Sequence, residues 1–305
     1  MSATTQERRL TIADIAKSYR EGRRIVAITA YDYPTARIVD ASGIPLILVG
    51  DSLGMVMLGY DSTVRVSIEE MLHHTKAVVR GTKRAIVVGD MPFLTYGISA
   101  EESVANAGRF LHEAGAQAVK IEGGTRSARA IEAMVRNGIA VMAHIGLTPQ
   151  AVNSLGGYKV QGRDRDSARR LLADAQAVQE AGAFAVVIEA VPTPLATAIT
   201  ERLAIPTIGI GAGTGCSGQI QVITDILGLT ADHTPKHARL YGQIGAAMGE
   251  ALAAYAHDVE EGTFPGEAES FAMDDAILAD VLGLGALDQA PSVSPVMAIP
   301  LDEDL

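Results

Sequence analysis

Residues 118–146, AVKIEGGTRSARAIEAMVRNGIAVMAHIG, contain two short apolar runs separated by a helical pattern. The runs at 118–121 and 140–143 are almost continuously apolar, which is typical of strands buried on both faces of a parallel sheet. Between them, 126–136 has helical spacing and ends just before Gly138, a residue suited to a helix C-terminus. This order of strand, helix and strand predicts a β-α-β unit with parallel pairing.

The same unit recurs in both directions along the chain. We predict eight strands, at 25–29, 46–49, 85–88, 118–121, 140–143, 185–188, 207–210 and 220–223. We predict intervening helices at 35–41, 67–80, 100–114, 126–136, 167–181 and 195–203, several of them ending at glycine (Gly43, Gly81, Gly115, Gly138, Gly182). Eight such units indicate an α/β fold of the closed (β/α)8 TIM-barrel type, with an eight-stranded parallel sheet. Little helix fits between the last two strands.

The regions flanking the barrel differ from it in character. A helix at 14–21 is expected before the barrel, and a longer helix near 236–261 is expected after it. Residues 272–305 begin with an apolar patch at 276–287, contain seven acidic residues and have no Lys or Arg. We therefore predict a single catalytic barrel domain at 1–271. An acidic, Pro-containing tail at 272–305 is expected to be partly disordered or docked on a neighbour.

Composition limits the classes of function. The chain has 305 residues and a formal net charge of −11, which argues against nucleic acid or an anionic membrane as a partner. Cys216 is the only cysteine, so no intrachain disulfide is expected. No apolar stretch is long enough for a membrane span, and the N-terminal residues do not have a signal-peptide pattern. We expect a cytoplasmic protein.

Ionisable side chains stand at the ends of five neighbouring predicted strands: Asp51, Asp90, Glu122, His144 and Glu189. In this barrel the C-terminal ends of the strands carry the active site. Three carboxylates from adjacent strands, Asp51, Asp90 and Glu122, could converge on one divalent cation, with Mg²⁺ the first choice for oxygen ligands. The alternative interpretation is that each is a helix cap or an ion-pair partner.

The remaining candidates leave several roles open. Lys120 lies two residues from Glu122 and shares its face of the strand, so it could bind a substrate carboxylate or enolate, pair with Glu122, or act as a Schiff-base amine. Glu189 follows a very apolar strand and is a candidate general base, with a capping or Arg-paired role as the alternative. His144 could bind substrate or orient a neighbouring side chain.

Several segments together resemble ketopantoate hydroxymethyltransferase. They are TAYDY at 29–33, VGDSLG at 49–54, KIEGG at 120–124, HIGLTPQ at 144–150, GGYKVQG at 156–162, IGIGAG at 208–213 and FPGE at 264–267. The resemblance extends from about residue 10 to 271 in one order. One departure is Cys216-Ser217 before the Gly-Gln pair, where the family usually has Asp. The tail has no family counterpart.

The resemblance implies a reaction and residue roles. The family transfers a hydroxymethyl group from 5,10-methylenetetrahydrofolate to 3-methyl-2-oxobutanoate. The product, 2-dehydropantoate, lies on the biosynthetic route to pantothenate and coenzyme A. Asp51, Asp90 and Glu122 would then be the metal-site acids. Ser52 and Lys120 would hold the keto acid, and Glu189 would accept its proton. Family members form homo-oligomers, typically decamers.

Other classes of protein remain possible on the sequence alone. A metal-dependent C–C lyase of the isocitrate lyase or phosphoenolpyruvate mutase type would use the same rim of carboxylates without folate. A Schiff-base aldolase would use Lys120 and would survive chelation. A non-catalytic metabolite-binding barrel would leave the ionisable strand ends unexplained.

Overall fold

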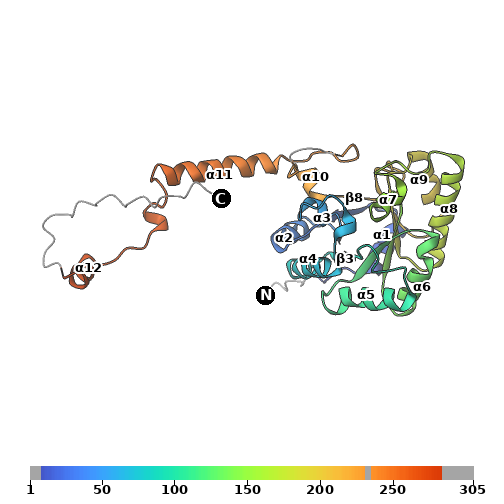
Figure 1. Cartoon of the computed structure of the whole chain (residues 1–305), viewed down its shortest axis with the longest axis horizontal. Helices are drawn as coiled ribbons and strands as arrows, with labels where there is room; N and C mark the ends of the chain where they lie inside the picture. The colour runs from blue at the N-terminus through green and yellow to red at the C-terminus, as the bar shows by residue number, and fades with distance from the viewer. Residues whose placement is uncertain (1–7, 231–234, 284–305) are drawn as a thin grey trace, which may run out of the picture. The chain divides into compact units, whose positions relative to one another are not determined.

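The computed structural model describes residues 8–230 and 235–283. Eight parallel strands pair in sequence order, and β8 closes on β1, so the sheet is a closed barrel as predicted (Figure 1). The strands are β1 (Ile25–Thr29), β2 (Leu46–Val49), β3 (Ile86–Asp90), β4 (Ala118–Glu122), β5 (Val141–Gly146), β6 (Ala185–Glu189), β7 (Thr207–Ile210) and β8 (Gly218–Gln221).

Helices alternate with the strands, which confirms the (β/α)8 barrel. They are α1 (Ile12–Arg20), α2 (Tyr33–Ala41), α3 (Leu53–Val56), α4 (Ile68–Gly81), α5 (Ala100–His112), α6 (Ala128–Arg136), α7 (Val152–Leu155), α8 (Arg165–Glu180), α9 (Thr193–Thr200), α10 (Ile223–Leu227), α11 (Ile244–Glu260) and α12 (Asp275–Val281). No helix lies between β7 and β8, in agreement with the short spacing there.

Two predicted boundaries were wrong for reasons that the backbone pairing explains. The eighth strand begins at Gly218 because Gly218 pairs with both β1 and β7, and Ile223 already belongs to α10. The last long helix begins at Ile244 and not near 236. Backbone hydrogen bonds from Tyr241 and Gly245 to the α10 region, at 2.8 and 3.3 Å, hold the preceding segment in a non-helical conformation.

Four of the five predicted helix-ending glycines have the left-handed backbone that this role requires (Gly43, Gly115, Gly138, Gly182). Gly81 was predicted to do the same, but it is the last residue of α4 and has no positive φ. It is needed there for close packing, because a Cβ at this position would lie 2.6 Å from the carbonyl oxygen of Tyr33.

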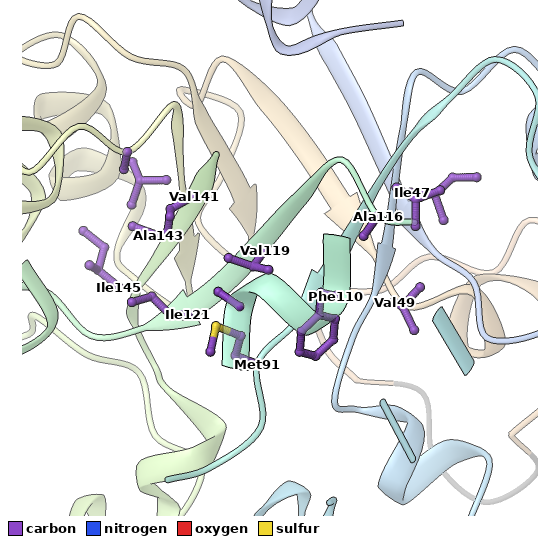
Figure 2. Packing of buried hydrophobic residues seen from close by; sticks show 14 of the residues in the cluster. Ile47, Val49, Met91, Phe110, Ala116, Val119, Ile121, Val141, Ala143 and Ile145 are labelled. Atoms are coloured by element: carbon purple, nitrogen blue, oxygen red, sulfur yellow. The ribbon is translucent and has the colours of Figure 1, made fainter. Parts of the chain in front are cut away.

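Two apolar layers hold the barrel together. The outer layer lies between the strands and the helices, where Phe110 of α5 packs near Val119 and Val49 (Figure 2). The inner layer fills the barrel with alternate strand residues such as Leu46, Ile86 and Met142. Strand residues therefore face either the inside or the helices, as alternation along a strand requires.

Helix α1 covers the N-terminal end of the barrel. Its buried Ile15 belongs to the inner apolar layer, and the Tyr19 hydroxyl donates to the carbonyl of Leu203, just before β7. The opposite, C-terminal end of the barrel is left for the loops that follow the strands.

The described residues divide into two units, one that ends at residue 247 and one that begins at residue 248. The boundary predicted between 271 and 272 stays a prediction, and much of the predicted tail, 284–305, lies outside the described residues. Its described part contains α12, in the predicted apolar patch. None of the described helices is long and apolar enough to cross a membrane.

Candidate active site

A cavity of about 450 Å³ lies at the C-terminal ends of the strands. Every residue predicted for the site lines it: Asp51, Ser52, Asp90, Lys120, Glu122, His144 and Glu189. Apolar side chains such as Leu48, Val187 and Ile210 line the rest of its wall. The structure therefore brings the predicted polar residues together in one space, and its volume falls in the range of roughly 300–1,000 Å³ typical of small-molecule sites.

Lys120 and Asp90 form a buried ion pair. The ammonium Nζ lies 2.7 Å from both carboxylate oxygens of Asp90. The register of β3 and β4 pairs these two residues directly across the strands. Lys120 therefore bonds Asp90, and the alternative of a structural pair with Glu122 was wrong.

Asp51 and Glu122 are connected to each other through two neutral residues, Gln150 and Tyr96, that the sequence did not single out. Gln150 donates from Nε2 to Asp51 Oδ2 at 2.8 Å, and its backbone N–H donates to Glu122 Oε2 at 3.1 Å. Tyr96 donates to Gln150 Oε1 at 2.6 Å and accepts from the Glu122 backbone N–H at 3.0 Å. Gln150 ends the segment HIGLTPQ, but a neutral side chain gives no charge signal by which its role could be predicted.

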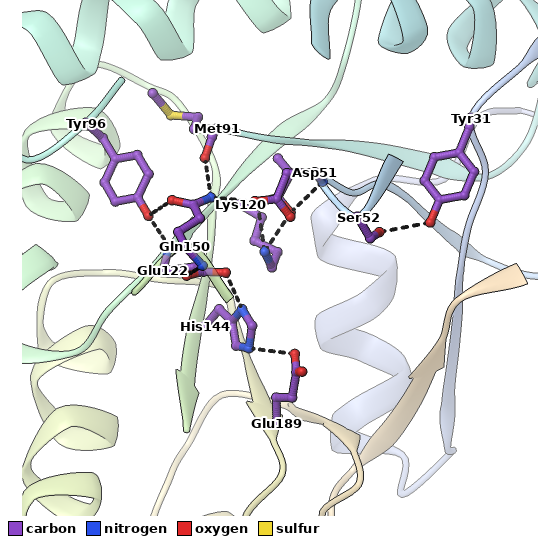
Figure 3. A network of polar contacts seen from close by, with 11 residues as sticks. Tyr31, Asp51, Ser52, Met91, Tyr96, Lys120, Glu122, His144, Gln150 and Glu189 are labelled. Atoms are coloured by element: carbon purple, nitrogen blue, oxygen red, sulfur yellow. Dashed lines mark hydrogen bonds and ion pairs between the residues drawn. The ribbon is translucent and has the colours of Figure 1, made fainter. Parts of the chain in front are cut away.

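His144 connects Glu122 to Glu189. Its Nδ1 lies 3.5 Å from Glu122 Oε1, and its Nε2 lies 3.2 Å from Glu189 Oε2 (Figure 3). Burial and the Lys120 charge lower the pKa of His144, but the two carboxylates outweigh them and raise the pKa to about 9. This pKa favours the imidazolium form, whose positive charge lies between the two acids.

The backbone at Gly146 allows Glu189 to lie close to β5. Gly146 has φ +95°, and a Cβ there would lie 2.2 Å from the carbonyl oxygen of Glu189. The next amide, of Leu147, donates to that same oxygen at 2.9 Å. Only glycine permits both the left-handed backbone and this approach, which positions the Glu189 side chain at the cavity wall.

Burial dominates the charge balance of the cluster. It raises the pKa of Asp51 well above its usual range, with the Asp90 charge adding to the effect. Burial also raises the pKa of Asp90, although Lys120 opposes this. Burial alone would lower the pKa of Lys120, but the charges of Asp90, Asp51 and Glu122 outweigh it and raise the pKa. Lys120 is therefore a firmly protonated ammonium, which disfavours its use as a Schiff-base nucleophile.

The donor set of the cluster fits a divalent cation in the chemistry of its ligands. Asp51, Asp90 and Glu122 are three buried carboxyl groups, and carboxylate oxygens are the ligands that a hard cation such as Mg²⁺ prefers. The Asp51 backbone N–H donates to Asp90 Oδ2 at 3.2 Å, so these two acids are adjacent. Among the described residues, however, no three His, Cys, Asp or Glu side chains are already grouped as metal ligands. The predicted three-acid metal set stays a prediction.

Two other predicted features have clear local surroundings. The Ser52 hydroxyl lies 2.9 Å from the hydroxyl of the fully buried Tyr31, which orients it at the cavity wall. In the segment that departs from the family pattern, Cys216 is buried and Ser217 bonds Thr207 from its backbone N–H at 3.0 Å. Neither Cys216 nor Ser217 lines the cavity.

These features define a class of protein. A closed parallel barrel with a buried, ionisable cluster in a cavity at the C-terminal strand ends is a (β/α)8-barrel enzyme.

Comparison with known proteins identifies the family. The sequence profile described as ketopantoate hydroxymethyltransferase matches residues 9–267. A 3-methyl-2-oxobutanoate hydroxymethyltransferase from Chloroflexus aurantiacus is 60% identical and is aligned over 92% of this chain and 99% of its own length. One from Dehalococcoides mccartyi is 52% identical, over 90% and 98%. The chain therefore belongs to the ketopantoate hydroxymethyltransferase family, enzymes that transfer one-carbon groups.

Solved structures with a similar fold have little sequence in common with this chain. A phosphonopyruvate hydrolase in complex with oxalate and Mg²⁺ superimposes with a TM-score of 0.55 at 15% identity, covering 90% of this chain and 95% of that one. A 2,3-dimethylmalate lyase of the phosphoenolpyruvate mutase/isocitrate lyase superfamily superimposes with a TM-score of 0.51 at 17% identity, covering 90% and 95%. At these identities the likeness extends to the fold alone.

Proposed function

We propose that this enzyme transfers a hydroxymethyl group from 5,10-methylenetetrahydrofolate to 3-methyl-2-oxobutanoate and forms 2-dehydropantoate. The C3–H bond of the keto acid breaks, and its proton moves to Glu189. The resulting enolate carbon bonds to the one-carbon unit that the folate carries. A water molecule supplies the hydroxyl oxygen as the bonds to the folate nitrogens are lost, and tetrahydrofolate leaves.

The polar residues of the cavity divide this work between them. The Lys120 ammonium and the Ser52 hydroxyl bind the substrate carboxylate. Glu189 removes the proton, and the His144 imidazolium, 3.2 Å from its carboxylate, holds it in position. Lys120 keeps its bond to Asp90, so a fixed positive charge faces the charge that develops on the substrate.

Asp51 and Asp90, with Glu122 behind them, would hold a divalent cation, with Mg²⁺ the expected ion. The chemistry that such a cation supplies when bound is Lewis acidity, which makes the proton next to a ketone easier to remove. The oxygen donors of the three buried acids support this assignment.

The observation that carries the proposal is the shared cavity. Glu189, the Lys120–Asp90 pair and Asp51 line one space, in a chain whose family members carry the name of this reaction. A general base, a carboxylate-binding ammonium and a divalent-cation site are the three groups that deprotonation of an α-keto acid requires.

Proton NMR of 3-methyl-2-oxobutanoate with the protein tests the proposal. We expect 2-dehydropantoate only when both Mg²⁺ and 5,10-methylenetetrahydrofolate are present, and none after EDTA. Substrate cleavage without folate would favour the lyase, and EDTA-resistant turnover trapped by borohydride would favour the Schiff-base aldolase. No turnover with any divalent metal would support the non-catalytic barrel and overturn the transferase.

We further propose that the chain works as a cytoplasmic homo-oligomer, with a decamer as the expected state. Helix α11 supports the assembly, since five of its large apolar residues recur three or four positions apart and are all exposed: Ile244, Met248, Leu252, Tyr255 and Val259. Such a stripe is typical of a helix that packs on an apolar partner. The tail at 272–305 is expected to cover a subunit contact.

Light scattering tests the assembly. Leu252→Glu is expected to lower the molar mass, because it places a charge in the middle of the stripe, whereas Glu250→Gln on the same helix should leave it unchanged. Deletion of 273–305 with no change in mass would exclude the role of the tail.

A further inference from the structure

We propose that Gln150, oriented by Tyr96, is a positioning residue that holds Asp51 and Glu122 in one fixed geometry. The inference rests on the proposed function, since it assigns a task within the same site. It concerns two neutral side chains, and neither is among the residues that line the cavity.

Gln150 connects four different strand ends. It lies in the short 3-10 helix Pro149–Ala151 after β5 and is only 4% exposed. Its amide Nε2 donates to Asp51 Oδ2 after β2 and to the carbonyl of Met91 after β3, at 2.8 and 3.0 Å. Its backbone N–H donates to Glu122 Oε2 on β4. Both amide hydrogens are thereby used, and a shift of this residue would disturb both acids at once.

The direction of the hydrogen bonds follows from one fixed donor. The backbone N–H of Glu122 can only donate, so the Tyr96 oxygen accepts from it. The Tyr96 hydrogen is then available for Gln150 Oε1, 2.6 Å away. That bond fixes the orientation of the amide, and its NH₂ end must face Asp51. The rotated amide would place Oε1 against the Met91 carbonyl, an acceptor that has no hydrogen to donate.

The consequence for the site is that the Asp51 carboxyl group is held in one orientation. With Oδ2 held by Gln150, the orientation of the other oxygen toward the cluster is restricted. Side chains that orient the acids of a metal site typically change metal affinity roughly 10- to 100-fold when removed. Gln150 and Tyr96 act in series, so removing both should cost little more than removing one.

The experiment compares Gln150→Leu, Tyr96→Phe and the double variant in the full-length protein. Two controls match these changes away from the Asp51–Glu122 cluster: Gln176→Leu, whose amide bonds Glu180 on the α8 surface, and Tyr60→Phe, whose hydroxyl bonds Glu70. The readouts are Mn²⁺ affinity by electron paramagnetic resonance, kcat and KM for the keto acid, and Tm.

We expect Gln150→Leu to weaken Mn²⁺ binding about 10-fold or more and to raise the KM of the keto acid. Tyr96→Phe should do the same to a smaller extent, and the double variant should resemble Gln150→Leu. A merely structural role would lower Tm in every variant and leave Mn²⁺ affinity and KM of the folded protein at wild-type values. That result, or additive effects of the two changes, would overturn the inference.

A failure of the inference is distinguishable from a failure of the proposed function. Wild-type turnover that is insensitive to EDTA, with no Mn²⁺ bound, would refute the metal role in the proposed function. The KM of the keto acid and the coupling between the two variants would still decide whether Gln150 positions the acids. Wild-type metal dependence with unchanged affinity and KM in Gln150→Leu would refute the positioning role alone.

Discussion

Two ion pairs in this barrel have the same closest N–O distance, but the pKa of the carboxyl group is raised in one and lowered in the other. The Lys120–Asp90 pair at the rim and the Arg109–Glu113 pair on α5 both have a closest N–O distance of 2.7 Å. The Lys120 and Asp90 side chains are 4% and 1% exposed, whereas those of Arg109 and Glu113 are 31% and 33% exposed. On the surface the Arg109 partner lowers the pKa of Glu113, and at the rim burial raises the pKa of Asp90 despite Lys120.

The difference shows that burial, and not the N–O distance, distinguishes the ion pair at the rim from the ion pair on the surface. A surface pair is solvated whether or not its partner is present, so little depends on it. A buried pair depends on every member, because each charge that loses its partner remains desolvated. The buried charges of Lys120 and Asp90 therefore lower the folding stability of the barrel, and such a cost is typical of active sites.

Among the variants that test this comparison, Glu189→Gln is expected to have the largest effect, which is on the rate of proton removal. The variant keeps the shape and the hydrogen-bonding capacity toward His144 but cannot accept a proton. Loss of a general base typically lowers the rate roughly 10²- to 10⁴-fold. We expect solvent exchange at C3 of 3-methyl-2-oxobutanoate to fall by this factor, measured by proton NMR in D₂O, with Mn²⁺ affinity retained. Exchange at the wild-type rate would exclude Glu189 as the base.

Lys120→Met is expected to have the next largest effect. Removal of one partner of a buried ion pair typically costs about 3–5 kcal/mol, because the other charge is left desolvated. Tm should fall by roughly 10 °C, and turnover should be lost with the carboxylate-binding ammonium. The matched control is Lys76→Met, since Lys76 pairs with Glu113 on the surface at 3.7 Å. Equal losses of Tm in the two variants would break the comparison.

The contrast between these lysines also shows how far the sequence could predict the site. Apolar runs were enough to predict eight strands, and the seven site residues predicted at or near the strand ends all line the cavity. The partner of Lys120 could not be predicted, because it depends on strand register, which pairs residue 120 with residue 90 and leaves Glu122 farther along β4. Gln150 and Tyr96 were missed because neutral side chains in loops acquire their role only from the folded geometry. The close packing at Gly81 is likewise a tertiary contact.

The smallest effect on Tm is expected when the surface ion pairs of Arg109 are removed. Arg109 donates to both Glu69 and Glu113, so Arg109→Ala removes two ion pairs at once. Exposed pairs contribute little, and we expect Tm at pH 7 to fall by roughly 2 °C or less, with kcat and KM unchanged.

The pH dependence of the Arg109→Ala effect gives the sign of the surface interaction. The hydrogen bonds from Arg109 lower the pKa of Glu69 and of Glu113 in the folded protein. A carboxyl group with a lowered folded pKa stabilises the protein above its unfolded pKa of about 4.3, and this stabilisation is lost as the pH falls through the folded pKa. The Tm difference between wild type and Arg109→Ala should therefore be present at pH 7 and shrink below about pH 4. Thermal unfolding from pH 3 to 8 measures this, and a difference that stays constant on acidification would mean that Arg109 stabilises α5 through packing of its side chain and not through charge.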